Sequence, residues 1–365
     1  MGPRIDGDRK MTVVDCHAHA LPPSVQNAFV DWLKTSGATS EGPPGLWSSP
    51  AFSDVDLHLA DADRHDIETT ILTYGSNTVA AMHAAAQRES PKPAAETMIA
   101  RTNDALRSWA AHTSNRLMPT RWVDPRFPDS AVSEIERAAT DGGVAAISMN
   151  SAYGDPASGL RFLDDPGFGP TLRAAEAADV VVIVHPSAKF SLNSQPPLTG
   201  TANHLLTGGL SMLVETTTCI SRLILSGVFD KNPKLRMVFS QLGGVLPMAF
   251  GRFDMLRDLV SVADETATKA VSALPSLRDY ADFIFADTHS MDVAALKCGI
   301  EALGSNHLIF GSDFPVTPSH IGREQALKTL DALPLDPVEQ IAVRSSNARK
   351  LFGLNPTPPR QEMAS

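Results

Sequence analysis

The sequence predicts a single α/β domain in which eight parallel strands close into a (β/α)₈ TIM barrel. Eight short runs typical of β-strands alternate with amphipathic stretches, as in parallel strands joined by crossover helices. The run 180–184 (VVVIV) is apolar throughout, as in a strand buried on both faces. With 365 residues, 43% of them hydrophobic, the chain can fill one large barrel. We expect the barrel to span 11–355, with disordered tails at 1–10 and 356–365.

Each strand is expected where a short apolar run ends near polar or turn-forming residues. The predicted strands are Thr12–Cys16, Thr69–Thr73, Leu117–Val123, Val144–Met149, Val180–Val184, Arg236–Ser240, Phe283–Ala286 and Leu308–Gly311. Amphipathic helices are predicted at Ser130–Thr140, Thr171–Ala178 and Glu215–Ser226. A closed barrel is the most economical arrangement of these elements. A doubly wound open sheet is the alternative.

Two long insertions depart from a minimal barrel. Residues 22–60 follow the first strand, are rich in Pro, Gly and Ser, and contain Trp47. Residues 186–212 follow the fifth strand. Both are expected at the carboxyl-terminal face of the barrel, where barrel active sites lie. Loops of this length in a compact domain are typical of lids or substrate-binding elements.

The composition excludes several classes of partner. Lys and Arg total 31 against 41 Asp and Glu, so the formal net charge is −10 and the surface repels nucleic-acid phosphates. No apolar run reaches the roughly 18 residues of a membrane span. The polar amino terminus lacks the apolar core of a secretory signal. Three scattered cysteines indicate reduced thiols, and we expect a cytoplasmic protein.

Two histidines end the first predicted strand. The stretch 15–19 reads Asp-Cys-His-Ala-His, and alternate residues of a strand point to the same face. His17 and His19 therefore share a face, which in a closed barrel can be the interior. Two imidazoles directed inward at the end of a strand make half of a metal site.

Two further strand ends complete the pattern. His185 directly follows the apolar fifth strand, and Asp313 follows the eighth. Burying His17, His19, His185 and Asp313 together is costly unless a divalent cation compensates them. The structural alternative is that His185 caps a strand and Asp313 a helix. Nitrogen-rich ligation favours zinc, with manganese as the alternative. Histidines in helical or polar stretches are expected at the surface or as caps: His58, His65, His83 and His112.

The order of these motifs resembles the amidohydrolase superfamily, in particular the amidohydrolase-2 group that includes aminocarboxymuconate-semialdehyde decarboxylase. The resemblance covers most of the chain and rests on VVDCHAHALP, LDDPGFGPTLRAAEAADVVVIVHP, SGVFDKNPKLRMVFSQLGGVLPMAFGRFD, HLIFGSDFP and SNARKLFGL. It implies a metal-dependent barrel enzyme with a small-molecule substrate. The implied ligands are the four residues already selected from the strand ends.

One position departs from the family pattern. The family carries a histidine at the end of the sixth strand, as an acid/base beside the metal, where this chain has Gln241. An amide cannot shuttle a proton near neutrality. Three interpretations are open: Gln241 is an engineered substitution that traps a ligand, the native reaction needs no shuttle there, or His289 at the end of the seventh strand takes the role.

The substrate contacts also differ from those of the muconate-semialdehyde enzyme. Of two carboxylate-binding arginines in that enzyme, one matches Arg252, which the resemblance places across a homodimer interface. The other has no match, and Ser187 stands where the family has a tryptophan. We therefore expect a different substrate, with Arg252, Ser187 and Trp47 as candidate contacts. A structural ion pair is the alternative for Arg252, and core packing is the alternative for Trp47.

The leading functional hypothesis is a metal-dependent lyase that decarboxylates a small unsaturated or aromatic carboxylic acid. Asp313 would transfer the proton and Arg252 would hold a carboxylate. The second hypothesis is a metal-dependent hydrolase of a lactone, ester or amide, in which Asp313 accepts the proton of bound water. The third is a catalytically impaired variant or binding protein, motivated by Gln241.

Overall fold

The computed structural model describes residues 12–36, 45–75, 77–87, 94–143, 146–155, 158–187, 189–190, 200–263, 276–290, 292–318 and 320–354. Its strands are β1 Val13–His19, β2 Ile67–Thr73, β3 Leu117–Pro119, β4 Arg121–Trp122, β5 Ala146–Asn150, β6 Ala152–Asp155, β7 Gly159–Phe162, β8 Val181–His185, β9 Met237–Phe239, β10 Ile284–Asp287 and β11 Leu308–Ile309. Its helices are α1 Pro23–Ser36, α2 Val55–Arg64, α3 Thr78–Ala86, α4 Ala95–Ala110, α5 Pro128–Thr140, α6 Gly169–Ala177, α7 Gly200–Leu206, α8 Met212–Leu225, α9 Val228–Lys231, α10 Leu246–Ala263, α12 Val293–Leu303, α13 Arg323–Asp331, α14 Pro337–Ile341 and α15 Asn347–Phe352.

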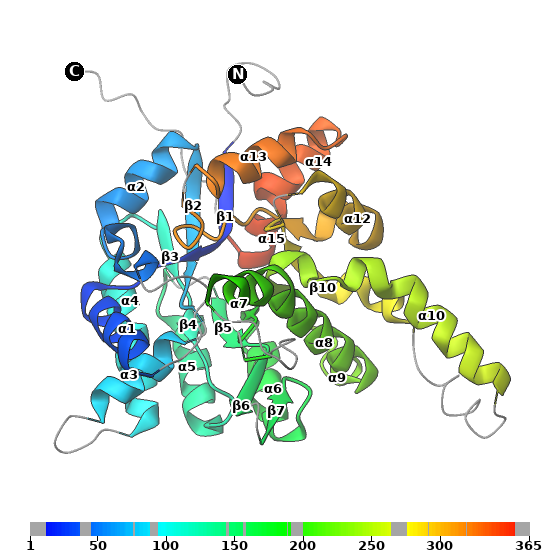
Figure 1. Cartoon of the computed structure of the whole chain (residues 1–365), viewed down its shortest axis with the longest axis horizontal. Helices are drawn as coiled ribbons and strands as arrows, with labels where there is room; N and C mark the ends of the chain where they lie inside the picture. The colour runs from blue at the N-terminus through cyan, green and yellow to red at the C-terminus, as the bar shows by residue number, and fades with distance from the viewer. Residues whose placement is uncertain are drawn as a thin grey trace.

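The parallel strands close into a barrel with helices around it (Figure 1). One sheet has the order β1-β2-β3 and the other has the order β11-β10-β9-β8-β5-β4. β3 and β4 are two halves of one strand, separated at Thr120, whose N–H donates to the carbonyl of Leu72 (2.8 Å). At the other seam, the segment after β11 pairs with β1, where Asp313 N–H donates to the carbonyl of His17 (2.7 Å). Both pairs of sheet edges are therefore joined.

The described strands include all eight that the sequence predicts, with ends shifted by a few residues. β1 continues three residues beyond its predicted end, to His19, and β11 ends two residues early, at Ile309. The predicted helices correspond to α5, α6 and α8. Because both seams are closed, the open-sheet alternative is wrong. The antiparallel hairpin β6-β7 was not predicted, because its two four-residue strands are too short to show a clear periodicity.

Alternate strand residues fill the barrel interior. Val14 of β1 and Ile309 of β11 are buried in one cluster with Leu351 of α15. Arg349, also on α15, donates to the Thr12 hydroxyl just before β1 (2.9 Å). α15 therefore covers the end of the barrel at which the strands begin, and the opposite end is left for the polar strand termini.

His58 contradicts its predicted surface or capping position. It lies on α2 and is completely buried, with its ring centroid 5.3 Å from Trp109 and 5.0 Å from Phe314. Desolvation, together with the nearby Arg323 charge, lowers its pKa from 6.5 to about 3, so the ring is neutral at physiological pH. The contact packs the insertion after β1 against the end of the eighth barrel strand.

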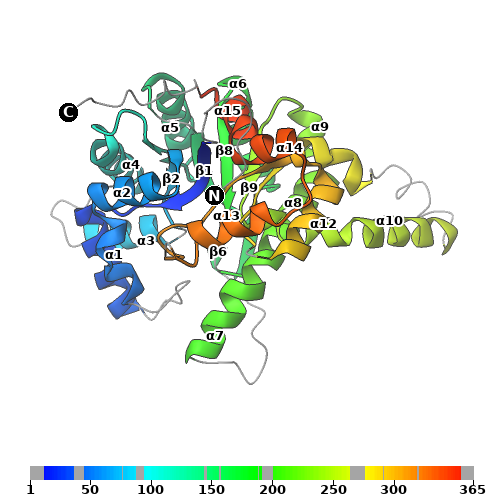
Figure 2. The same ribbon diagram turned by 90° about the horizontal axis from the view of Figure 1, so that it is seen from above.

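Two helices extend beyond the compact body. Figure 2 shows α7 and α10 projecting away from the barrel in different directions. Among the described residues, none of the helices combines the length and apolar character needed to cross a membrane. Several predicted features lie outside the described residues: the tails 1–10 and 356–365, residues 37–44 of the first insertion, and residues 188 and 191–199 of the second.

Candidate metal centre

A β-bulge near the end of β1 sets the direction of its histidines. Asp15 pairs with Thr70 and Ala18 pairs with Leu72, so three steps along β1 match two along β2. The extra residue shifts the alternation. As a result, Asp15 faces the helical layer, whereas His17 and the residue two positions later, His19, both face the barrel interior.

The four predicted ligands meet at the carboxyl-terminal end of the barrel. His17, His19 and His185 each offer one ligand atom, and these atoms lie within 4.8 Å of one another. Asp313 Oδ1 lies 3.0 Å from His19 Nε2 and 3.5 Å from His17 Nε2. All four side chains are at least nine-tenths buried. β1, β8 and the segment after β11 therefore contribute to one compact cluster.

The atoms that point into this cluster lack hydrogen-bond partners. Among the described residues, none makes a hydrogen bond to His17 Nε2, His19 Nε2 or Asp313 Oδ1, although all three are buried. Leaving such atoms unpaired in a protein interior costs free energy. Two imidazole nitrogens and a carboxylate oxygen, with His185 beside them, are the donor set that zinc and manganese accept. The residues present therefore fit a divalent cation.

The opposite edge of each imidazole is fixed by an oxygen atom. His19 Nδ1 lies 3.2 Å from the carbonyl of Thr73, and His185 Nδ1 lies 2.9 Å from the carbonyl of Pro186. A carbonyl oxygen only accepts hydrogen bonds, so Nδ1 carries the hydrogen in both rings. Each Nε2 is then left with a free lone pair, which is the form that binds metals.

Asp287 orients the third imidazole and was missed by sequence reasoning. Its Oδ2 accepts from His17 Nδ1 (2.6 Å), and its Oδ1 accepts from the backbone N–H of His289 (3.0 Å). The available signal was its position, the last residue of β10, two residues before His289. Gly311 makes room for this contact, because a Cβ there would lie 2.8 Å from the Cβ atoms of both His17 and Asp287.

Proton occupancy follows from this arrangement. Burial lowers the pKa of His17, but the carboxylates of Asp287 and Asp313 outweigh it and raise the pKa to about 9. Burial, followed by the charges of His19 and His17, lowers the pKa of His185 to about 3. Burial opposes ionisation of Asp313, yet the surrounding histidines hold its pKa well below 3.8. Without a cation, the cluster therefore holds a proton on His17.

His289 lies beside the proposed ligands. Its Nε2 is 3.4 Å from Asp313 Oδ2, and its ring centroid is 5.5 Å from that of His17. Desolvation lowers its pKa from 6.5, partly opposed by the Asp313 charge. Its Nδ1 is buried and has no hydrogen-bond partner among the described residues. His289 is thus placed to exchange a proton with Asp313 or to contact a bound molecule.

Gln241 begins a run of four residues with positive φ that ends at Gly244. Its Nε2 lies 3.8 Å from Met212 Sδ, and its Oε1 is buried without a hydrogen-bond partner among the described residues. Gly244 approaches α8 closely, because a Cβ there would clash with the carbonyl oxygen of Leu213.

The three predicted substrate contacts lie in different surroundings. Ser187 is completely buried, and its N–H donates to Glu215 Oε1 (2.6 Å), which fixes the loop after β8. Trp47 is 3% exposed, with its ring 5.1 Å from that of Phe29, as core packing predicts. Arg252 is exposed on α10. The structure does not bring these three together with the histidine cluster, and their contacts with substrate remain predictions.

A parallel barrel with this cluster at the carboxyl ends of its strands defines the class of metal-dependent barrel enzymes. A family model described as Amidohydrolase matches residues 14–354. The chain belongs to the amidohydrolase family, as the sequence motifs predict. The match spans every strand of the barrel except the first residue of β1.

The chain is similar to several decarboxylases. It is 27% identical over 306 residues to the gamma-resorcylate decarboxylase of Rhodococcus jostii, covering 82% of this chain and 88% of the relative. It is 22% identical over 359 residues to the 2-amino-3-carboxymuconate-6-semialdehyde decarboxylase of Dictyostelium discoideum, covering 94% and 92%. The 5-carboxyvanillate decarboxylase of Novosphingobium aromaticivorans, solved with manganese and 4-hydroxy-3-methoxy-5-nitrobenzoic acid, shares the fold with a TM-score of 0.73, 20% identity and coverage of 95% and 97%.

Proposed function

We propose that this protein is a metal-dependent decarboxylase of a small aromatic or unsaturated carboxylic acid. The observation that carries the proposal is the convergence of His17, His19, His185 and Asp313 with unpaired ligand atoms. Family membership supports an enzyme, and the similarity to decarboxylases of aromatic acids favours this reaction over hydrolysis.

The proposed reaction breaks the bond between the carboxylate and the unsaturated carbon that carries it, which is a ring carbon in an aromatic substrate. A cation held by the four ligands would stabilise the negative charge that develops as carbon dioxide leaves. The electron pair stays on the unsaturated carbon, which then takes a proton. Asp313 and His289, 3.4 Å apart, form a pair that could relay this proton from solvent, since the His289 side chain is 17% exposed.

We infer that Gln241 serves by hydrogen bonding and that His289 supplies the titratable group. The Gln241 amide is buried with an unpaired Oε1, so it can contact a polar substrate group without moving a proton. Restoring histidine by Gln241→His tests the alternative that this chain is an impaired enzyme. Activity that arises only in Gln241→His would contradict our assignment, and activity that disappears in His289→Gln would support it.

We propose zinc as the resident metal, with manganese as the alternative. Three imidazoles and one carboxylate favour zinc, and a structural neighbour was solved with manganese. Elemental analysis of protein purified without added metal distinguishes the two ions. One equivalent of zinc per chain supports the first assignment, and one of manganese supports the second.

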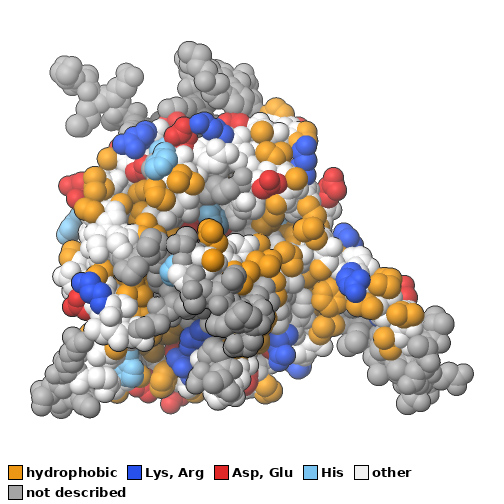
Figure 3. Space-filling view, in the orientation of Figure 1, with side chains coloured by type: hydrophobic (Ala, Val, Ile, Leu, Met, Phe, Trp, Pro, Cys, Tyr) orange, Lys and Arg blue, Asp and Glu red, His pale blue; other side chains and the backbone are white. Residues whose placement is uncertain are grey.

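We also propose that the chain forms a homodimer through α10. Met248, Met255 and Leu259 are 77%, 48% and 56% exposed and recur along one side of this helix. Figure 3 shows hydrophobic side chains gathered over this part of the surface. Arg252 lies in the same row and could then reach a partner's substrate. Light scattering of Met255→Lys, with Val338→Lys as an exposed apolar control elsewhere, tests the interface.

The first insertion is proposed to wall the substrate site. Support comes from α2, whose His58 packs on Phe314, the neighbour of Asp313.

A cytoplasmic location is proposed from the three free cysteines, Cys16, Cys219 and Cys298.

The decisive experiment supplies metal-loaded protein with a panel of hydroxylated benzoic acids and unsaturated dicarboxylic acids. We expect carbon dioxide and the decarboxylated product from at least one of them. A matched panel of lactones and esters tests hydrolysis. Hydrolysis without any carbon dioxide release would replace the decarboxylase assignment.

A further inference from the structure

Asp313 adopts a backbone conformation that its own side chain does not favour. Its φ is 58°, in the left-handed region where residues other than glycine are uncommon. Such a conformation persists only when neighbouring contacts hold it. Asp313 N–H donates to the carbonyl of His17 (2.7 Å), and its own carbonyl accepts from Thr317 N–H (2.8 Å). These two bonds hold Asp313 itself, and further contacts hold the residues on either side.

The residue before Asp313 is held by Asp15. The hydroxyl of Ser312 donates to Asp15 Oδ2 (2.6 Å), and its backbone N–H donates to Asp15 Oδ1 (3.1 Å). The same hydroxyl accepts from the N–H of Phe314 (3.2 Å). Asp15 is completely buried and faces the helical layer because of the bulge in β1. It therefore supports the centre from outside the barrel wall.

The residue after Asp313 is held by Arg323. This arginine, at the start of α13, is completely buried, and its guanidinium carbon lies 4.3 Å from the ring centroid of Phe314. Its Nε donates to Asp15 Oδ2 (3.0 Å), and its Nη1 donates to Asp61 Oδ2 (2.7 Å). Arg323 thus balances the Asp15 charge and packs on Phe314 at the same time.

We propose that Asp15 and Arg323 are positioning residues that fix the Asp313 carboxylate at the metal centre. They act through Ser312 and Phe314, which flank Asp313, and Asp15 Oδ1 also accepts from the backbone N–H of His17 (3.3 Å). The inference rests on the metal centre of the proposed function. Neither residue carries a role in that proposal.

The test measures Zn²⁺ and Mn²⁺ affinity of the metal-free full chain by isothermal titration calorimetry, with melting temperature as a second readout. Asp15→Asn keeps the shape of the side chain but removes its charge. Glu134→Gln is the matched control, since Glu134 is equally buried and accepts from a buried arginine, Arg121 (2.7 Å), in another cluster. Both variants are expected to melt at a lower temperature.

Of these two variants, Asp15→Asn but not Glu134→Gln should weaken metal binding, by about 10- to 100-fold, as for other residues that orient ligands. Ser312→Ala removes a single hydroxyl, should keep the fold, and should weaken binding several-fold, which covers the case in which Asp15→Asn fails to fold. The loss of metal affinity in Arg323→Lys should lie between those of Asp15→Asn and Ser312→Ala. Unchanged metal affinity in Ser312→Ala and in folded Asp15→Asn would overturn this inference but leave the metal centre in place. An equal loss of metal affinity in Glu134→Gln would do the same. Wild-type protein that binds neither ion would overturn the metal centre, and this inference with it.

Discussion

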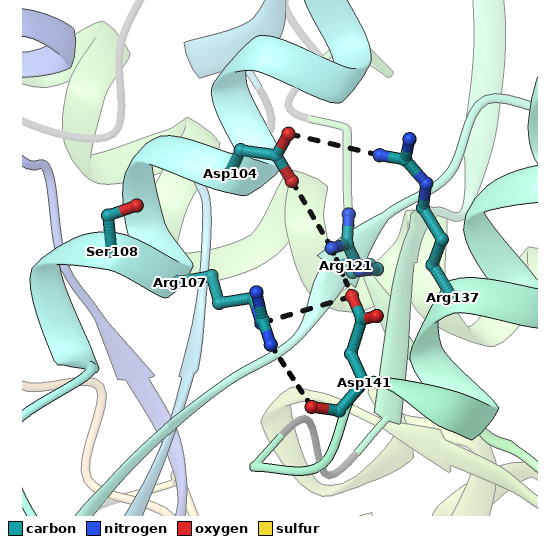
Figure 4. A pocket seen from close by; sticks show the side chains of 6 residues that line it. All are labelled: Asp104, Arg107, Ser108, Arg121, Arg137 and Asp141. Atoms are coloured by element: carbon teal, nitrogen blue, oxygen red, sulfur yellow. Dashed lines mark hydrogen bonds and ion pairs between the residues drawn. The ribbon is translucent and has the colours of Figure 1, made fainter.

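Two polar clusters of this molecule, one of them buried and the other partly exposed, differ in how their charges are matched. The cluster at the carboxyl ends of the strands presents imidazole and carboxylate atoms without hydrogen-bond partners among the described residues. The other lies between α4 and α5 around Arg121, whose side chain is 3% exposed and donates to Glu134 (2.7 Å), Asp104 (3.2 Å) and Asp141 (2.5 Å). It borders a cavity of about 460 Å³ lined by Asp104, Arg107, Ser108, Arg121, Arg137 and Asp141 (Figure 4).

The cavity beside Arg121 does not make that cluster a ligand site. Figure 4 shows its arginines directed at the two aspartates, so each positive charge already has a carboxylate partner. The histidine cluster instead leaves the atoms that a cation needs unpaired and fixes the opposite edges of the rings. Ligand atoms that converge without hydrogen-bond partners indicate a functional site here better than the size of a cavity does.

The strongest test of this difference removes one ligand. His185→Ala should abolish stoichiometric metal binding and lower kcat by at least about 100-fold, because the developing charge loses its stabilisation. Bound metal is measured by elemental analysis and turnover by carbon dioxide release. Full metal content and activity in His185→Ala would show that the cluster is not the metal site.

The pH dependence of binding is the next largest effect. The pKa of His17, raised to about 9, means that a cation must displace a proton at lower pH. Apparent Zn²⁺ affinity should therefore rise about tenfold per pH unit well below that value, or about 50-fold from pH 7 to pH 9. Competition with a chelator of known affinity measures this slope. A flat profile would contradict a proton held on His17.

Loss of the carboxylate behind His17 should have a somewhat smaller effect. Asp287→Asn should weaken metal binding by about 10- to 100-fold, because the His17 ring loses its charged acceptor. The same variant should reduce the slope of affinity against pH, since Asp287 helps to raise the pKa of His17. Wild-type affinity in Asp287→Asn would limit its role to packing.

The smallest effect on metal binding is expected from the arginine cluster. Arg121→Met leaves Glu134 without its buried cation and should lower the free energy of unfolding by about 3–5 kcal/mol. Metal affinity of the folded protein should stay within about twofold of wild type, because the described ion pairs of the two clusters share no residue, and sites without shared partners act independently. A large loss of affinity would mean that the two clusters are coupled.

Local patterns predicted the ligands because strand ends are readable in the sequence. An apolar run places its final residue at one face of a parallel barrel, which located His185 and Asp313 without any tertiary information. The bulge in β1 was not predictable in this way, because it depends on register with β2. Simple alternation would put Asp15 on the same face as His17, which is not what the structure has.

Contacts between distant segments account for the other differences. Asp15 and Arg323 are 308 positions apart, and Asp287 is 270 from His17, so neither pairing leaves a local signal. His58 lies in a helical stretch with polar neighbours, yet tertiary packing buries it under Phe314. Residues that support the centre were therefore harder to predict than those proposed to bind the cation.

The bulge in β1 gives the two faces of this strand different roles. Asp15, before the extra residue, faces the helical layer and supports Ser312, the neighbour of Asp313. Cys16 packs with Val14 in the apolar cluster, and His17 directly after it lies in the ligand cluster. One extra residue therefore lets a single strand contribute both to the apolar interior and to the proposed ligand set.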